Sequence, residues 1–177
     1  HDIWLGDDGL VSQIIDAGFD GVYLDWVEAY SDDNVATAAS DDDVDPVEAM
    51  VDWVSAIAET GRDDNPSFLV IGQNVAELAA DHAGYRAVID AVAQEQVWFD
   101  GAADNDPPGD CRLPSTDGLV DTEAYEATLS ADCARQYFEF PNSTLHVSSE
   151  EYLTWLDTVW AMGVPVFTVD YATVGEN

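Results

Sequence analysis

The chain has 177 residues, a length typical of one domain (residues 1–177), and 47% of them are hydrophobic, which is enough to build a core. Its formal net charge is −33 at pH 7, because 37 acidic residues face 4 basic ones, all of them Arg. A surface this acidic repels phosphate backbones and anionic lipids. We therefore expect no nucleic-acid partner and no membrane partner.

The absence of Lys points to a salt-rich environment. Self-repulsion at this charge is costly in dilute salt, whereas near 1 M salt the Debye length falls to about 3 Å. The composition favours a protein adapted to high salt over an acidic protein of an ordinary cytosol. A neutral or cationic substrate suits such a surface better than an anionic one.

The first elements are a helix and a strand. Apolar residues at helical spacing in residues 10–17, followed by Gly18 as a C-cap, predict a helix. The short apolar run 19–25 then predicts a buried strand. We expect residues 31–46 to form a polar, Asp-rich loop.

A helix and a second strand follow this loop. Asp45 and Pro46 provide an N-cap and a first helical residue for a helix that ends at Gly61. The apolar run 67–73 predicts the second strand, which ends at Asn74. Both strands are short and apolar throughout, as expected when both faces of a parallel sheet are covered.

The remaining elements continue the alternation of helices and strands. Helices are predicted over three ranges: 75–87, 121–138 and 149–162. Strands are predicted over 89–95 and 164–169. The segment 101–120, rich in Asp, Pro and Gly, is expected to be a long loop of the kind that often carries function. This alternation predicts an α/β fold with a parallel sheet and right-handed crossovers.

One sequence pattern occurs twice. Residues 18–25 and 88–95 both read apolar–Asp–small–Val–x–x–acid, and each delivers a carboxylate at its far end, Asp25 and Glu95. Ligands of parallel α/β proteins bind at the carboxyl ends of the strands. Two carboxylates at one such face are the groups that acid/base chemistry on sugars requires.

The other polar residues at strand ends have several candidate roles. Asp20 and Asp90 begin their strands and are expected to bond backbone N–H groups there. Asn74 either holds a sugar hydroxyl, orients a carboxylate or caps the following helix. Asp170 and Tyr171 are expected to bind substrate or to shift the pKa of a catalytic acid.

Aromatic residues fall into two groups by position. Four lie near strand ends, where they can stack on sugar rings: Tyr23, Trp26, Tyr30 and Trp98. Three fall on helical faces and are expected in the core: Trp53, Trp155 and Trp160. The first group makes a carbohydrate ligand plausible at the same edge of the sheet as the carboxylates.

The two cysteines leave two alternatives open. Cys111 and Cys133 form either one disulfide, in a secreted chain, or two buried thiols, in a cytosolic one. They lack metal-ligand spacing, and we expect neither a metal nor a cofactor.

Several of these segments resemble one enzyme family. Gly-Phe-Asp-Gly-Val-Tyr-Leu-Asp followed by Trp-Val-Glu-Ala-Tyr (18–30) resembles the hallmark strand of the endo-α-1,4-polygalactosaminidase-like glycoside hydrolases (glycoside hydrolase family 114 and its relatives). The Gln73-Asn74 strand end, Glu95 after an apolar run, and Gly-x-Pro-Val-Phe-x-Val-Asp-Tyr-Ala (163–172) look like later strands of that family, in the same order.

The resemblance implies a (β/α)₈ barrel that acts on exopolysaccharides containing galactosamine, often outside the cell or at its surface. It implies that Asp25 and Glu95 are the catalytic carboxylates. It also implies that Asn74, Asp170 and Tyr171 line the site.

The chain also departs from the family. Val164 stands where a Lys commonly follows the Gly of the last motif. Barrels of this class need about 250 residues, and the matched strands look like the fourth to seventh. The chain is therefore expected to be either a fragment of a longer barrel or a compact variant that closes its sheet edges by association, for example as a homo-oligomer.

We therefore predict a glycoside hydrolase in which Asp25 is the nucleophile or base and Glu95 the general acid. A non-catalytic carbohydrate-binding or structural remnant of the same fold is the alternative. A catalytic relative that acts on another acyl or glycosyl bond is a third hypothesis.

Overall fold

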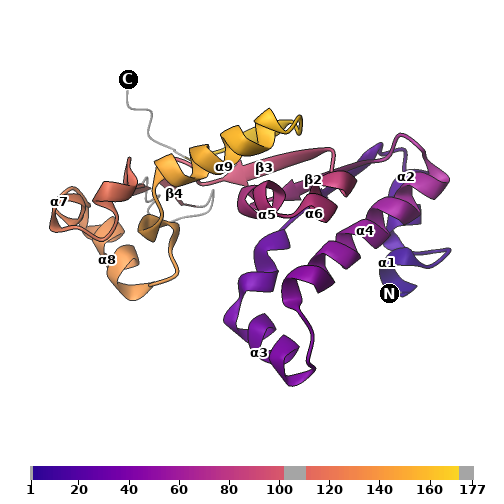
Figure 1. Ribbon diagram of the computed structural model, residues 1–177, viewed down its shortest axis with the longest axis horizontal. Helices are drawn as coiled ribbons and strands as arrows, with labels where there is room; N and C mark the ends of the chain where they lie inside the picture. Colours follow the sequence, from indigo (N-terminus) through magenta and orange to yellow (C-terminus); the bar gives the residue numbers. More distant parts are fainter. Residues whose placement is uncertain (1, 102–110, 172–177) are drawn as a thin grey trace.

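A computed structural model describes residues 2–101 and 111–171. Its long axis runs from the N-terminal helices to a helical lobe made of residues 111–147, which we call the C-terminal lobe (Figure 1). Within these residues four strands form one parallel sheet, in the order β1-β2-β3-β6. Their bounds are Gly21–Leu24 (β1), Leu69–Gln73 (β2), Ala91–Glu95 (β3) and Val166–Val169 (β6). The α/β class, the parallel sheet and the position of β2 between β1 and β3 confirm the sequence-based prediction.

The register aligns the carboxyl ends of the four strands at one end of the sheet. Leu24 pairs with Gly72, Gly72 with Val92, and Val92 with Val166. Because parallel strands all point the same way, the residues at or directly after their carboxyl ends lie at one end of the sheet, which we call the carboxyl edge: Asp25, Asn74, Glu95 and Asp170. In the described residues β1 and β6 are the two outer strands of an open sheet.

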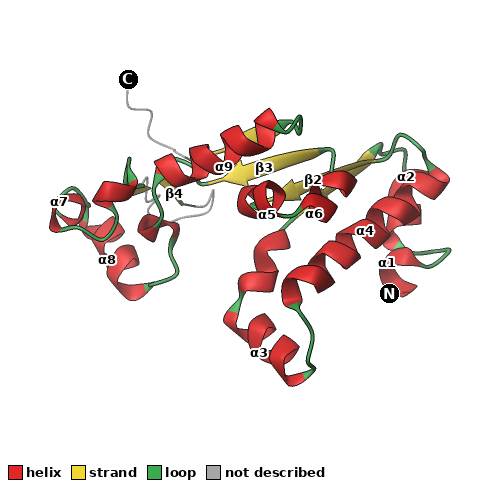
Figure 2. Cartoon of the chain, in the orientation of Figure 1, coloured by secondary structure: helices red, strands yellow, loops and turns green. Residues whose placement is uncertain are grey.

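The two faces of the sheet differ. On one face Val70 and Val92 are fully buried, and helices α5, α6 and α9 lie against the sheet (Figure 2). Gly72 is required there, because a Cβ at this position would lie 2.1 Å from the hydroxyl oxygen of Tyr85. On the other face, which we call the open face, the side chains of Tyr23, Leu69 and Phe167 are about half exposed.

Most of the helices surround the covered face and the N-terminal end of the chain. They are α1 (Asp2–Leu5), α2 (Leu10–Asp16), α4 (Pro46–Asp64), α5 (Ala76–Asp81), α6 (Ala83–Val88) and α9 (Ser149–Ala161). The predicted N-cap of α4 is confirmed, and α9 has an N-cap as well. Asp45 accepts hydrogen bonds from two backbone N–H groups of α4, and Ser148 accepts one from Glu151 at the start of α9. No helix of the described ranges is both long enough and apolar enough to cross a membrane.

The segment predicted as a loop over 31–46 is helical, so that prediction is wrong. Val27–Ser31 forms a 3₁₀ helix, η1, and Asp33–Asp41 forms α3. Asp32 caps α3 by accepting hydrogen bonds from the N–H groups of Asn34 and Val35. Asp32, one of the Asp residues that suggested a loop, is therefore an N-cap, and the Ala residues that follow it in the sequence favour a helix.

Two predicted helices are each interrupted. The helix predicted over 75–87 is split at His82, whose Nδ1 accepts the Tyr85 N–H and starts α6. The helix predicted over 121–138 is split into α7 (Glu123–Glu126) and α8 (Ala131–Glu139), since Ser130 caps α8. Both breaks come from side chains that accept backbone N–H groups, which sequence periodicity does not show.

The C-terminal lobe is cross-linked internally by a disulfide. Phe99–Asp100 (β4) and Cys111–Arg112 (β5) form a small antiparallel pair, and Cys111 is bonded to Cys133 on α8. This resolves the disulfide alternative. The loop predicted over 101–120 contains β5 and the 3₁₀ helix η2 (Asp117–Leu119), while 102–110 lies outside the described residues. A last 3₁₀ helix, η3 (Thr144–His146), precedes α9.

Three further predictions about single residues have different outcomes. Asp90 accepts hydrogen bonds from the Val70 N–H and from Arg62, both at 2.8 Å, which confirms its structural role at the start of β3. Trp160 is 63% exposed, so its predicted place in the core is wrong. Trp53 packs against the core as expected.

Candidate functional site

Glu95 is held by two phenols. It ends β3, and the Tyr23 hydroxyl donates a hydrogen bond to its Oε1 at 3.2 Å. The Tyr171 hydroxyl also hydrogen-bonds the Glu95 side chain. Burial, followed by the negative charge of Glu95, raises the pKa of Tyr23, and burial and the hydrogen bond to Glu95 raise the pKa of Tyr171. Both phenols therefore stay protonated and can donate to Glu95.

Asp25 belongs to the same electrostatic neighbourhood. It follows β1, its side chain is exposed, and its negative charge contributes to the raised pKa of both Tyr23 and Tyr171. Asp25 also borders an apolar cavity of about 330 Å³ beside Trp4 and Trp53. The structure thus brings Asp25, Glu95 and Tyr171 to one region of the sheet edge.

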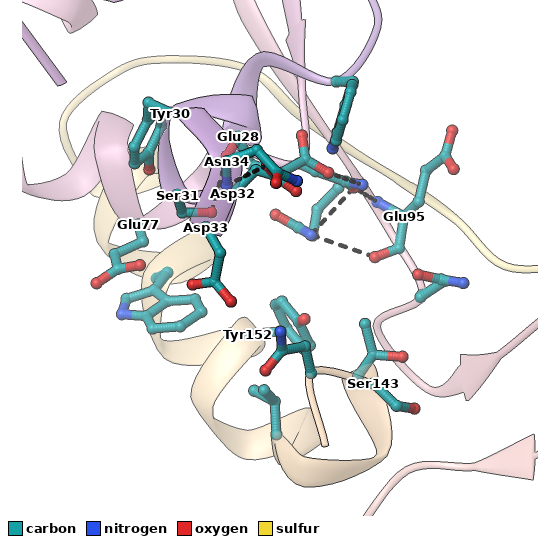
Figure 3. A pocket seen from close by; sticks show the side chains of 18 residues that line it. Glu28, Tyr30, Ser31, Asp32, Asp33, Asn34, Glu77, Glu95, Ser143 and Tyr152 are labelled. Atoms are coloured by element: carbon teal, nitrogen blue, oxygen red, sulfur yellow. Dashed lines mark hydrogen bonds between the residues drawn. The ribbon is translucent and has the colours of Figure 1, made fainter. Parts of the chain in front are cut away.

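A larger cavity, of about 730 Å³, opens at the same edge, between η1 and α3 on one side and α9 on the other (Figure 3). Its described wall holds carboxylates, amides and aromatic rings and no Lys, Arg or His. The carboxylates are Glu28, Asp32, Asp33, Glu77 and Glu95. Glu95 borders the cavity, but its carboxylate points away from the other labelled side chains (Figure 3). The cavity and the Glu95 carboxylate thus lie on different sides of the β3 end.

Asn74 connects these two regions. It has a positive φ of 55°, which turns its side chain between β3 and η1. Its Nδ2 donates to Glu28 Oε1 at 2.9 Å, and its Oδ1 accepts from the Glu95 N–H at 2.8 Å and from Gln94 Nε2 at 3.2 Å. Val75, not Asn74, is the N-cap residue of α5, so the capping alternative is wrong. Asn74 instead orients a carboxylate, that of Glu28.

Glu28 is a site residue that the sequence analysis did not single out. Burial is the largest cause that raises its pKa, and the charges of Asp25 and Glu95 add to it, while the hydrogen bond from Asn74 lowers it. Its Oε2 is buried and has no hydrogen-bond partner among the described residues. The sequence does contain one indication of its place in the site. Glu28 lies three residues after Asp25, within the segment Trp-Val-Glu-Ala-Tyr that follows Asp25.

Two of the predicted aromatic residues line the cavity. Trp26 has a positive φ of 56°, and its N–H donates to Gln73 Oε1. Tyr30 has a pKa raised to about 12 by burial and by the charges of Glu77 and Glu28. Trp155, expected in the core, is half-buried and also lines this wall.

Asp170 and Trp98 lie outside the described cavity wall. Asp170 Oδ1 accepts the N–H groups of Trp98 and Phe99, both at 2.9 Å. Asp170 therefore fixes the chain that leaves β3. In the described ranges no group of three or more His, Cys, Asp or Glu side chains is arranged to hold a metal ion.

No known protein-family profile matches the sequence. A protein of Deinococcus radiodurans, described only as uncharacterized, is 31% identical to this chain over 163 residues. That alignment covers 92% of this chain and 38% of the Deinococcus protein. The chain therefore spans well under half of the length of this relative.

Proposed function

We propose that the protein is a glycoside hydrolase in which Asp25 and Glu95 form the catalytic pair. Glu95 is the general acid and Asp25 the nucleophile or base. The observation that carries the proposal is the position of both carboxylates at the carboxyl edge of one parallel sheet, with the two phenols of Tyr23 and Tyr171 beside them. That edge is where ligands of α/β proteins bind.

The proposed substrate is a polysaccharide that contains galactosamine. We place the protein outside the cell or at the cell surface, in a high-salt environment. The cavity at the same end of the sheet supports a sugar ligand, because Trp26, Tyr30 and Trp155 offer rings to stack on and Asn34 and Asn142 offer amides to bond hydroxyls. The absence of basic side chains from its described wall suits a neutral or cationic glycan. The disulfide suits an oxidising compartment.

The proposed fold is of the (β/α)₈ barrel type, of which this sheet supplies strands resembling the fourth to seventh. Parallel sheets are normally covered on both faces, whereas Tyr23, Leu69 and Phe167 leave the open face half exposed. Further strands, or a second copy of the chain, would complete such a barrel and the site at its edge.

The decisive experiment measures reducing ends released from a galactosamine polymer in molar salt. Wild-type protein is expected to release them, and Glu95→Gln and Asp25→Asn are each expected to lower the rate at least a hundredfold, because each removes an acid/base group. Glu59→Gln, at an exposed position on α4 outside the site, is the matched control. Undiminished release in Glu95→Gln would rule out this pair.

A non-catalytic carbohydrate-binding role is the second candidate. The open face favours it, because a sheet with one exposed face and two free edges in the described residues is an incomplete support for catalysis. This role predicts binding of the polymer by wild-type protein without release of reducing ends. Asp25→Asn and Glu95→Gln would then leave binding unchanged.

A further inference from the structure

Trp26 has a backbone conformation that a bulky residue rarely adopts. Its φ of 56° is left-handed, and the other non-Gly residues with a positive φ in the described ranges are all Asp, Asn or Gln. Short polar residues tolerate this conformation, whereas a bulky one in it is strained and needs neighbours that hold its backbone in place. The side chain of Gln73 does so, because its Oε1 accepts the Trp26 N–H.

Gln73 occupies a buried position between the strands that lead to the two proposed catalytic carboxylates. It ends β2, which lies between β1 and β3, and it is 7% exposed. Alternate residues of a strand point to the same face, so Gln73 lies on the open face with Leu69. The register of β1 and β2 puts Asp25 at the level of Gln73. The Gln73 side chain therefore holds the turn in which Trp26 directly follows Asp25.

The side chain that this turn carries is accessible to a ligand. Trp26 is 57% exposed, and among the described residues it alone lines both the cavity of about 730 Å³ and the apolar cavity of about 330 Å³. The larger cavity borders Glu95, and the smaller one borders Asp25. Trp26 thus lies at the boundary between two cavities, each of which adjoins one of the proposed catalytic carboxylates.

We propose that Gln73 is a positioning residue that holds Trp26 at the boundary between two neighbouring sugar subsites, one in each cavity. The inference rests on the proposed glycan substrate and adds that the ligand is a chain of sugar units, because a single sugar would occupy only one of the two cavities. An exposed indole offers a flat apolar surface on which such a chain can stack. Without the acceptor on Gln73, the strained backbone of Trp26 is free to relax, and the ring leaves the boundary.

The first measurement needs no ligand. In protein labelled with fluorotryptophan, the ¹⁹F NMR resonance of Trp26 is assigned by its loss in Trp26→Phe. Gln73→Met removes the acceptor at nearly constant volume, so it is expected to shift the Trp26 resonance and leave the other Trp resonances in place. Gln136→Met is the matched control, because it removes a glutamine whose Nε2 donates to Asp100 in the C-terminal lobe. An unmoved Trp26 resonance in Gln73→Met, or equal shifts of all Trp resonances, would overturn the positioning role.

The second measurement is a double-mutant cycle on binding. The Kd of a galactosamine tetrasaccharide is measured in molar salt in the Glu95→Gln background, which prevents turnover. Trp26→Ala is expected to weaken binding roughly tenfold and Gln73→Met about three- to tenfold, while the two together weaken it no more than Trp26→Ala alone. Losses that multiply would mean that Gln73 does not act through Trp26. A tetrasaccharide that binds no more tightly than galactosamine itself would overturn the two subsites.

These outcomes separate the inference from the proposed hydrolase activity. If wild-type protein releases no reducing ends while the cycle shows the expected coupling of Gln73 and Trp26, the hydrolase alone is contradicted. If wild-type protein releases them while the two losses multiply, the positioning role of Gln73 alone is contradicted.

Discussion

Tyr23 on β1 donates a hydrogen bond to Glu95 at the end of β3, across the intervening strand β2. The hydroxyl of Tyr23 lies 3.2 Å from Glu95 Oε1 although the two residues are 72 positions apart. The contact joins two strands that do not pair with each other. It therefore fixes the Glu95 carboxyl over the open face of the sheet.

Tyr23→Phe removes this donor and leaves the ring in place. A hydrogen bond to a charged group contributes roughly 1.5–3 kcal/mol, so we expect the release of reducing ends to fall about ten- to hundredfold. The melting temperature should change little, because Tyr23 is about half exposed. Initial rates and thermal unfolding of the same preparations check this. Full activity in Tyr23→Phe would mean that the phenol does not orient Glu95.

The strand ends could be predicted from the sequence, but the partners of the site residues could not. Short apolar runs with a polar residue after them indicate buried parallel strands, so Asp25, Asn74 and Glu95 were found together. Their contacts are non-local. Asn74 donates a hydrogen bond to Glu28 although the two residues are 46 positions apart, and no local sequence pattern predicts that contact.

The helical errors have a local cause. Residues 31–46 look like a loop because they are rich in Asp, yet Asp32 acts as the N-cap of α3. The breaks at His82 and Ser130 are also made by capping side chains. The same residue types occur at helix caps and in loops, and only the hydrogen bond to the backbone distinguishes the two roles.

Tyr85→Phe is expected to leave the free energy of unfolding unchanged or to raise it by up to about 1 kcal/mol, because the Tyr85 hydroxyl is buried without a partner among the described residues. Tyr125→Phe is the matched comparison. Its hydroxyl donates to the Arg112 carbonyl oxygen at 2.9 Å, and its loss should cost about 1 kcal/mol. Denaturant titration of both variants checks the difference, and equal losses would contradict it.

Asp121 should stabilise the C-terminal lobe in a pH-dependent way. Hydrogen bonds from His146 and Tyr137 hold the pKa of Asp121 below its usual value. The unfolded chain therefore binds more protons between the two pKa values, so this stabilisation is present above pH ~3.8 and is lost as the pH falls through the lower, folded value. Asp121→Asn should lower the melting temperature near neutral pH and match wild type in strong acid. An equal deficit at every pH would show that the carboxylate charge is not responsible.

The Cys111–Cys133 disulfide closes a segment whose ends are 22 residues apart. A loop of that length restricts the unfolded chain by about 3 kcal/mol in the chain-entropy model. The double variant Cys111→Ser/Cys133→Ser should lose about that much free energy of unfolding in denaturant titrations. Reductant should reduce the stability of wild-type protein by a similar amount and leave the double variant unchanged. A reductant effect on the double variant would point to another cause.

Salt should stabilise the protein by screening. A net charge of −33 on 177 residues repels itself, and raising the salt from about 0.1 M to about 1 M shortens the Debye length from about 10 Å to about 3 Å. We expect the melting temperature to rise over this range in NaCl. Sucrose, which favours compact states without screening charge, is the control and should produce a smaller rise. An equal rise of the melting temperature in NaCl and in sucrose would show that the stabilisation does not come from charge screening.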